Sequence, residues 1–309
     1  MSRLPLPPKQ IVLDADRGLP VVRVAKGLTV YFDDGVHWSA SAATELFDAF
    51  LTRADRDRLS WFTTSMMHRW QSLRPEELPG LREQLVADRV LARVRHLFTF
   101  EVADARMAPV LAFRYHEIDA ARARHAGWLQ LLFPRAFSGD ELLALMLEIG
   151  QLHPVCCASA GWVASVAPGL GGTAFDGLYG MCKRYLGLDV AVPERGCRRA
   201  RSFLPSPAWL TLLGPSVLRP EETTRIIDHP FQHPGIRTFR LAGGLLLQAG
   251  AAPELGDGNL MELPVAMAEV AQVLDPWIDP RPIPFDGRWS EGDSMHAWVH
   301  RFASLEAWL

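Results

Sequence analysis

Two pairs of histidines have a spacing that could serve metal chemistry. His296 and His300 are four residues apart in a segment with helical periodicity, which would place both imidazoles on one face of a helix. Catalytic zinc takes three protein ligands, and neither a third ligand nor the glutamate of the zinc-protease pattern accompanies this pair. His229 and His233 have the same spacing, but a proline follows each of them and excludes a helix. We therefore expect no bound metal and no cofactor.

The residues that could act as nucleophiles or hold phosphate also lack the patterns of such sites. The four cysteines, Cys156, Cys157, Cys182 and Cys197, contain no C-x-x-C pair and no disulfide framework. The glycine-rich run 169–172 has neither the G-x-G-x-x-G spacing nor a following Lys-Ser or Lys-Thr. No serine lies in a G-x-S-x-G turn. The residue chemistry predicts no catalytic residue, so we expect a protein that is not an enzyme.

Strands and tight turns dominate the elements that must position these residues. Lys26-Gly27 is predicted to be a turn between two short strands, and Gly243-Gly244 predicts a hairpin late in the chain. The predicted strands are 21–25, 28–32, 61–70, 96–102, 110–118, 128–133, 155–166, 209–213 and the two arms of the hairpin 237–249.

Helical periodicity occurs between these strands. The predicted helices are one around 46–51, one from 76 to about 89, and the segments 141–149, 175–186, 260–274 and 294–308. Hairpins mixed with helices indicate an α+β fold, with antiparallel or mixed sheets and packed helices, rather than a β-α-β alternation. A strand–turn–strand–helix order recurs at 21–51 and 237–274, which is compatible with two similar lobes.

The composition is that of a globular protein. Of 309 residues, 49% are hydrophobic and 22% are charged, so the chain can bury a large core. Residues 1–19 contain several prolines and no apolar run, which predicts a flexible segment and neither a signal peptide nor a membrane anchor. We expect a main domain over 20–280 and an extension over 281–309 that ends in a helix. Few cysteines favour a reducing, cytoplasmic location.

The charge is unevenly distributed along the chain. From Glu254 onward there are ten acidic residues and three arginines, which gives −7, while the whole chain has a net charge of −3. An acidic terminal third can steer a basic partner toward it. It is also compatible with a solvated face that keeps the protein soluble. A basic cluster at 195–201 contrasts with it, but the overall balance does not favour binding of nucleic acid.

Five separated segments resemble one protein family. They are Tyr31-Phe-Asp-Asp-Gly35, Leu131-Leu-Phe-Pro134, Cys157-Ala-Ser-Ala-Gly-Trp162, Trp209-Leu-Thr-Leu-Leu-Gly214 and Ala249-Gly-Ala-Ala-Pro-Glu-Leu-Gly-Asp257. Their order and spacing over roughly residues 20–280 resemble the TsiV-type family of type VI secretion immunity proteins. The segment beyond about Pro280 has no counterpart in this resemblance.

The resemblance implies a cytoplasmic protein that binds one cognate effector toxin, typically a nuclease, and blocks it. It implies no catalytic residue, no direct contact with nucleic acid and no membrane. An acidic surface would mimic the charge of a nuclease's substrate. The candidate toxin-binding residues are Asp33, Asp34, Glu254, Asp257, Asp286, Glu291 and Asp293.

Two alternatives stay open at this point. The first is an enzyme or small-ligand-binding protein with a pocket between two lobes, using His296, His300 and a distant carboxylate. The second is self-association, because the ten tryptophans could serve a homodimer interface if some of them are exposed.

Overall fold

The structure is a computed structural model that describes residues 12–13, 19–33, 40–92, 97–118, 125–167, 171–190, 192–304 and 308. The predicted flexible segment 1–19 therefore lies largely outside the described residues. The strands are β1 (Val12–Leu13), β2 (Pro20–Phe32), β3 (Trp61–Thr64), β4 (Gln71–Ser72), β5 (Leu97–Ala103), β6 (Ala112–Ile118), β7 (Gly127–Phe133), β8 (Val155–Val166), β9 (Leu188–Asp189), β10 (Leu210–Leu213), β11 (Ile236–Leu241) and β12 (Gly244–Ala249).

Helices occur between these strands and after the last of them. The α-helices are α1 (Ala40–Arg53), α2 (Leu78–Ala92), α3 (Gly139–Leu152), α4 (Gly171–Arg184), α5 (Pro193–Gly196), α6 (Pro220–Ile227), α7 (Val265–Leu274) and α8 (Ser294–Val299). Short 3-10 helices are η1 (Arg56–Arg58), η2 (Pro75–Glu77), η4 (Gly258–Leu260), η5 (Asp275–Trp277) and η6 (Gly287–Ser290).

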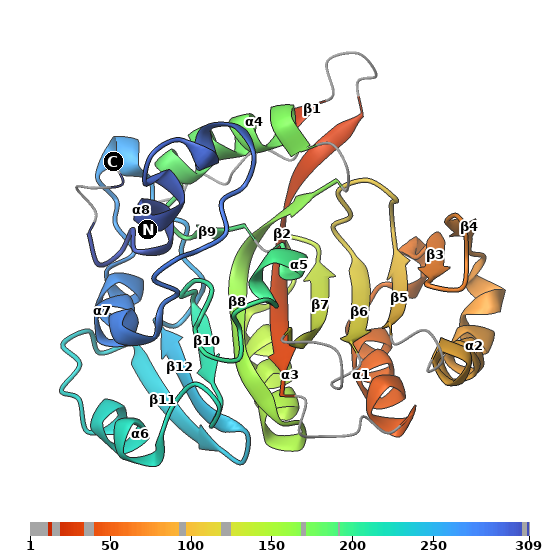
Figure 1. Cartoon of the computed structure of the whole chain (residues 1–309), viewed down its shortest axis with the longest axis horizontal. Helices are drawn as coiled ribbons and strands as arrows, with labels where there is room; N and C mark the ends of the chain where they lie inside the picture. Colours follow the sequence, from red (N-terminus) through yellow and green to blue (C-terminus); the bar gives the residue numbers. More distant parts are fainter. Residues whose placement is uncertain are drawn as a thin grey trace.

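The strands form a single sheet of 12 strands in the part of the chain that the structure describes. Its order is β11-β12-β10-β8-β2-β7-β6-β5-β3-β4, with β1 added to β2 and β9 added to β8 (Figure 1). All pairs are antiparallel except β8 with β9, which is parallel. The α+β prediction is confirmed. The two halves of the chain meet at β2 and β8 in the middle of this sheet and therefore share one continuous sheet.

The turn predicted at Lys26-Gly27 is wrong, because β2 runs without interruption from Pro20 to Phe32. Gly27 pairs with Leu132 of β7 on one side and with Gly161 of β8 on the other. A Cβ at Gly27 would lie 2.9 Å from the Leu132 side chain and 3.0 Å from the Leu131 carbonyl. The glycine permits close packing inside the sheet rather than a change of direction.

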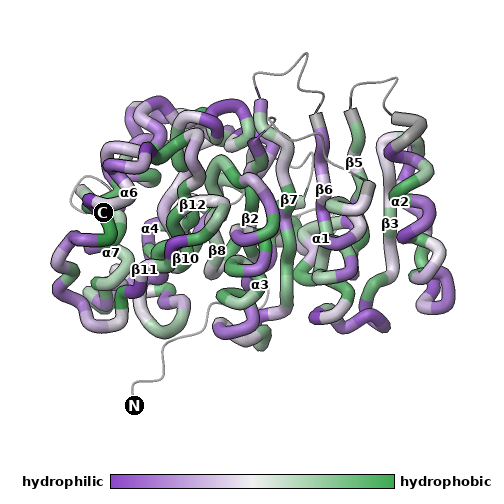
Figure 2. Tube along the Cα trace, turned by 90° about the horizontal axis from the view of Figure 1, so that it is seen from below, coloured by the Kyte–Doolittle hydropathy of each residue, from purple (hydrophilic) through white to green (hydrophobic). Residues whose placement is uncertain are grey.

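Helices α1, α2 and α3 cover one face of the sheet. Phe47 of α1 makes edge contacts with Phe100 of β5 and Phe113 of β6, with ring centroids 5.4 and 5.0 Å apart. Gly150 of α3 lies against Leu212 of β10, where even a Cβ would come within 3.0 Å of the leucine side chain. These contacts are part of the main hydrophobic core. Figure 2 shows hydrophobic residues gathered along the central strands and hydrophilic ones on outer segments.

The C-terminal segment packs on α4 through an aromatic cluster. Trp289 of η6 is fully buried, and its indole N–H donates to the Phe175 carbonyl at 2.8 Å. Its ring lies 5.2 Å from Phe285, 5.4 Å from Trp298 and 5.9 Å from Trp308. Figure 1 places α4, α7 and α8 together near the β11–β12 end, away from α1 and α2. Residues 281–304 thus share the core of the fold.

Two helix predictions are wrong at their ends. The helix predicted over 260–274 begins at Val265, because Pro264 precedes it and Met261 has a left-handed backbone with φ 56°. The helix predicted over 294–308 ends at Val299, and residues 305–307 lie outside the described part. By contrast, the strand predicted over 155–166 is confirmed residue for residue. In the described residues, none of the helices has the length and apolarity needed to cross a membrane.

Candidate functional site

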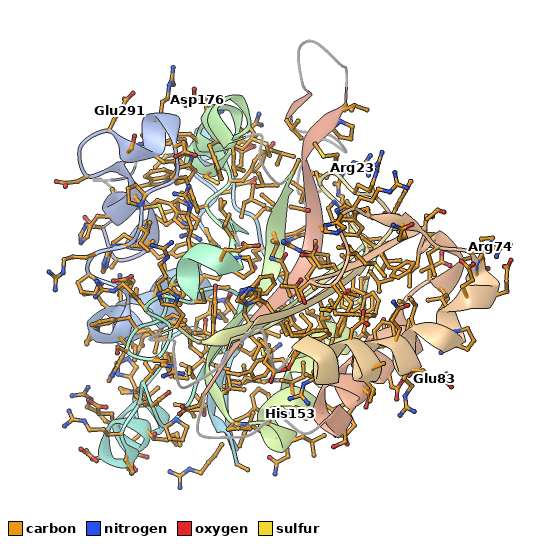
Figure 3. The ribbon with its side chains drawn as sticks, turned by 45° about the vertical axis from the view of Figure 1, so that its right-hand side comes forward. Arg23, Arg74, Glu83, His153, Asp176 and Glu291 are labelled. Atoms are coloured by element: carbon orange, nitrogen blue, oxygen red, sulfur yellow. The ribbon has the colours of Figure 1, made fainter. Side chains whose placement is uncertain are left out.

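Three of the predicted toxin-binding carboxylates lie close together in the fold. Asp286, Glu291 and Asp293 are exposed on η6 and the loop that leads into α8. The sequence did not predict that Asp176, exposed on α4, would join them: its carboxylate accepts the backbone N–H of Arg288 at 3.0 Å. Figure 3 shows Asp176 and Glu291 at the same corner of the molecule. We call these four residues the acidic corner.

A rigid base holds the acidic corner. Asp176 follows Phe175, whose ring stacks on Phe285 with centroids 4.9 Å apart, and Asp286 follows Phe285. Gly287 has φ 68°, and a Cβ there would collide with the Asp176 carboxylate. This glycine therefore allows the loop to approach α4 closely. The backbone that carries Asp176 and Asp286 is therefore attached to a packed aromatic pair.

Part of the charge of the acidic corner is compensated. Arg195 lies 3.5 Å from the Asp286 carboxylate and also donates to the Pro284 carbonyl. No ion pair links Glu291 or Asp293 to a cation among the described residues. Asp176 also has no ion pair in the part of the chain that the structure describes, so these three side chains provide the unpaired negative charge at this corner.

The other predicted contact residues lie elsewhere. Asp33 follows the last residue of β2, and its N–H donates to the Pro154 carbonyl at 3.2 Å. The acidic corner lies near the start of β2, because it is built on α4. Helix α4 contacts β1 and β2, and it follows β8, whose last residue, Val166, pairs with Val22 near the start of β2. A strand of 13 residues is about 40 Å long, so Asp33 and the acidic corner lie near opposite ends of β2. Glu254 is exposed on the loop after β12, and Asp34 lies outside the described residues.

Asp257 has an internal role in the loop before α7. Its side chain is fully buried and makes two bonds of 2.7 and 3.0 Å to the Arg184 guanidinium. Its carboxylate also accepts the Asn259 N–H at 3.0 Å. The hydrogen bond from Arg184 lowers the pKa of Asp257, so the carboxylate stays ionised. These contacts fix the turn and bury the Asp257 carboxylate.

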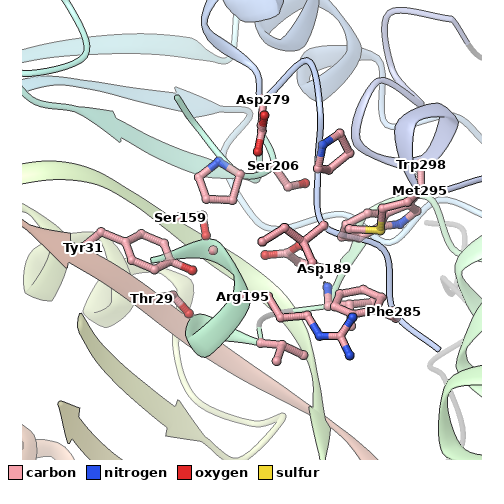
Figure 4. A pocket seen from close by; sticks show the side chains of 16 residues that line it. Thr29, Tyr31, Ser159, Asp189, Arg195, Ser206, Asp279, Phe285, Met295 and Trp298 are labelled. Atoms are coloured by element: carbon pink, nitrogen blue, oxygen red, sulfur yellow. Dashed lines mark hydrogen bonds between the residues drawn. The ribbon is translucent and has the colours of Figure 1, made fainter. Parts of the chain in front are cut away.

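A small polar pocket lies beside the acidic corner (Figure 4). Its cavity volume is about 50 Å³. The polar residues that line it are Thr29, Tyr31, Ser159, Asp189, Arg195, Ser206 and Asp279. Apolar side chains complete the wall, among them Val190, Val192, Pro282, Ile283, Phe285, Met295 and Trp298. The pocket lies between the middle of the sheet and the C-terminal segment.

A buried carboxylate and a buried guanidinium dominate the electrostatics around the pocket. Burial raises the pKa of Asp189 to about 6, against the opposing attraction of Arg301 and hydrogen bonds from Ser159 and Ser206. Burial also lowers the pKa of Arg301 to about 10. The Arg301 guanidinium donates to the carbonyls of Leu186 and Trp298 at 2.7 and 2.9 Å. Both groups thus retain their charges near neutral pH.

The histidines with helical spacing do not form a metal site. His296 and His300 stack with ring centroids 4.4 Å apart, and His300 contacts the Asp275 carboxylate at 2.8 Å. In the described ranges, no group of three or more His, Cys, Asp and Glu side chains is placed to hold a metal ion. The four cysteines are free and buried.

Comparison with known proteins identifies the family. The family model described as type VI immunity for VRR-NUC, TsiV, matches residues 41–302. The chain belongs to the TsiV family. The match includes most of the segment 281–309, for which the sequence resemblance gave no counterpart. It agrees with the aromatic packing of that segment on α4.

A solved structure supports the same fold. The Pseudomonas aeruginosa T6SS protein PA0821 superposes with a TM-score of 0.73 at 16% identity, over 94% of this chain and 88% of that chain. No curated protein matches the chain. At this identity the likeness shows the fold alone.

The five segments that resemble the family lie next to one another in the fold. They lie on or directly after β2, β7, β8, β10 and β12, which are five adjacent strands of the sheet. For example, Trp162 at the end of the third landmark donates to the Pro253 carbonyl in the fifth at 2.9 Å. The TsiV landmarks therefore encode the central sheet, whereas the acidic corner lies outside all of them.

Proposed function

We propose that this chain binds a cognate type VI secretion effector with a VRR-Nuc nuclease domain and neutralises it, so that the producing cell survives. The observation that carries the proposal is the family match over residues 41–302. As an inhibitor, the chain would act by stoichiometric binding rather than by catalysis. It would need no cofactor and would make no direct contact with nucleic acid. It would act in the cytoplasm, where the nuclease meets its substrate.

The acidic corner is the surface that we assign to the first encounter with the effector. A nuclease must attract a phosphate backbone, so its cleft is positively charged. Exposed Glu291 and Asp293 lack ion pairs among the described residues, so their field extends into solvent. Complementary charge raises the rate of association and orients the partner. Asp33, Asp34 and Glu254 would contact the effector at other points or remain solvated.

Co-expression tests the proposal directly. Cells that express the effector encoded next to this chain should die without it and grow when the chain is present. The two purified proteins should elute together in gel filtration, and the complex should have lost nuclease activity on plasmid DNA. An effector with a substituted nuclease active site allows the complex to be purified without toxicity. Absence of both a complex and protection would refute the proposal.

Self-association remains a separate prediction. Gel filtration with light scattering on the chain alone measures its mass. A mass of twice 34.4 kDa would indicate a homodimer. Comparison with the complex would then show whether the effector displaces the second copy.

A further inference from the structure

The polar pocket contains two hydroxyl groups that have no partner. Thr29 and Tyr31 are adjacent inward positions on β2, with exposed fractions of 2% and 4%. Within the described part of the chain, neither hydroxyl makes a hydrogen bond, although both side chains line the cavity. Both hydroxyl oxygens keep some surface open to the cavity, so a polar ligand or water can reach them there.

The carboxylate at the centre of the pocket also lacks a direct counterion. Asp189 is 6% exposed and accepts the Val190 N–H at 2.9 Å. In the described residues, no Lys, Arg or His nitrogen lies within 4.0 Å of its carboxylate. Arg301 is near enough to affect its pKa, but its guanidinium is directed to backbone carbonyls and to Ser206. A buried carboxylate gains strongly from a donor that carries positive charge.

The wall of the pocket does not suit an anion. Arg195, the cation that lines it, uses its guanidinium for the Pro284 carbonyl and for Asp286. Asp279 at the other side pairs with Arg199 at 2.9 Å. An anion would therefore meet the Asp189 carboxylate without a free cation to balance it. The groups left over are one carboxylate and hydroxyls that can accept hydrogen bonds.

We propose that this pocket binds an alkylammonium or alkylguanidinium group, with the cationic head on Asp189, Tyr31 and Thr29 and the alkyl stem against the apolar wall. One water needs about 10–15 Å³ of such space, so about 50 Å³ holds a head group of roughly four non-hydrogen atoms. Val192, Ile283 and Met295 supply the apolar contact for the stem. In Figure 4 Asp189 lies between Thr29 and Tyr31 on one side and Met295 on the other.

The glycine that ends α5 keeps the hydroxyl of Tyr31 in place. A Cβ at Gly196 would overlap the Tyr31 oxygen. Gly196 is helical and has no positive φ, so alanine fits its backbone. Gly196→Ala should therefore displace the Tyr31 ring into the pocket without any change of charge.

The first experiment uses small probes that all have a short alkyl chain and carry a positive, a negative or no charge. Propylammonium and propylguanidinium chloride, propanol and sodium propanoate are titrated into the ¹⁵N-labelled chain. The two cations should shift amides around 29–31, 159 and 189–190 with a saturating 1:1 curve, whereas propanol and propanoate should not. Shifts that do not saturate, or equal effects of all four probes, would overturn the proposal.

Variants show whether the pocket groups are responsible. Asp189→Asn and Gly196→Ala should each weaken binding of propylammonium at least tenfold, and Tyr31→Phe should weaken it severalfold. Glu291→Gln, at an exposed carboxylate outside the lining, is the matched control and should bind as the wild type does. Should Asp189→Asn fail to fold, Tyr31→Phe and Gly196→Ala decide the matter. Unchanged affinity in the folded variants would contradict the assignment.

The same variants distinguish the two sources of such a group. If the head group is a Lys or Arg side chain of the effector, Tyr31→Phe and Asp189→Asn weaken the complex and propylammonium competes with the effector. If it is a free amine, the complex is unaffected while the amine still binds. The pocket chemistry does not depend on the proposed immunity function, because the probe titration needs no effector.

Discussion

Replacement of Trp289 by alanine should destabilise the whole domain. A buried tryptophan removes about 200 Å² of surface from water, which at about 25 cal/mol per Å² corresponds to about 5 kcal/mol. Measured Trp→Ala substitutions in cores cost about 3–5 kcal/mol. Trp289 is fully buried and has four aromatic rings with centroids within 6 Å of its own, so we expect about 4–5 kcal/mol.

Thermal unfolding followed by circular dichroism measures this loss. At about 2 °C per kcal/mol for a chain of this size, the Tm should fall by about 8–10 °C. Trp289→Phe keeps the ring packing but leaves the Phe175 carbonyl without its donor, so it should cost about 1–3 kcal/mol. Leu152→Ala, at a side chain that is 64% exposed, is the control and should change stability by less than about 0.5 kcal/mol.

The result also tests the role of the C-terminal segment. Hydrogen exchange on Trp289→Ala should show faster exchange first in η6, α8 and the facing turn of α4. A Tm within about 2 °C of the wild type would refute the reasoning, because it would mean that residues 281–304 contribute little to the core.

Three further predictions concern charge and thiols. Burial raises the pKa of Asp189 to about 6. A carboxyl pKa that is higher in the folded state lowers the free energy of unfolding above that pH, and this loss disappears below the unfolded value of about 3.8. Urea unfolding should therefore show that the free energy of unfolding of Asp189→Asn rises relative to wild type by up to about 3 kcal/mol between pH 4 and pH 8. Glu291→Lys should slow association with the effector up to about tenfold at low salt and much less at high salt. Glu83→Lys, on the opposite side of the molecule (Figure 3), is the control and should have little effect. Equal slowing by both variants in a stopped-flow measurement would contradict the role of the acidic corner. All four thiols are buried, and burial raises the pKa of Cys156 to about 12 and of Cys197 to about 11. A disulfide reagent should therefore label none of the four cysteines in the native protein and all four in urea. Rapid labelling of the native protein would be inconsistent with this packing.

Local patterns predicted those parts of the fold in which each strand contains its own signals. The hairpin at Gly243-Gly244 and the strand Val155–Val166 needed no information from distant residues. The turn predicted at Gly27 was wrong because a glycine in a strand pattern is compatible both with a turn and with close packing of a neighbouring strand. Only the position of β7 beside Gly27 distinguishes the two. Leu260, Met261 and Leu263 continue the helical pattern toward the N-terminus, but Pro264 lies directly before the first residue of α7, and the helix begins after it.

The candidate site was less predictable because its residues meet through tertiary contacts. Asp257 looked like a free carboxylate, but Arg184 lies 73 positions away in sequence and reaches it. Nothing in the sequence indicated that Asp176 lies near Asp286. The two are brought together by tertiary contacts, namely the positive φ of Gly287 and the stacking of the Phe175 and Phe285 rings. The pocket combines hydroxyls on β2 with a carboxylate on β9, a pairing that requires knowledge of the sheet order.

The order of the sheet also decides which edge is exposed while the chain is being synthesised. Strands β2 to β7 come from residues 20–133 and can form one half of the sheet before the other half exists. During that interval β2 offers the backbone groups of 11 paired positions to any passing strand, until Val155–Val166 arrives to cover them. The centre of the finished sheet is thus an open edge until β8 has been synthesised, and during that interval the nascent chain can mispair at a strand that is later fully enclosed.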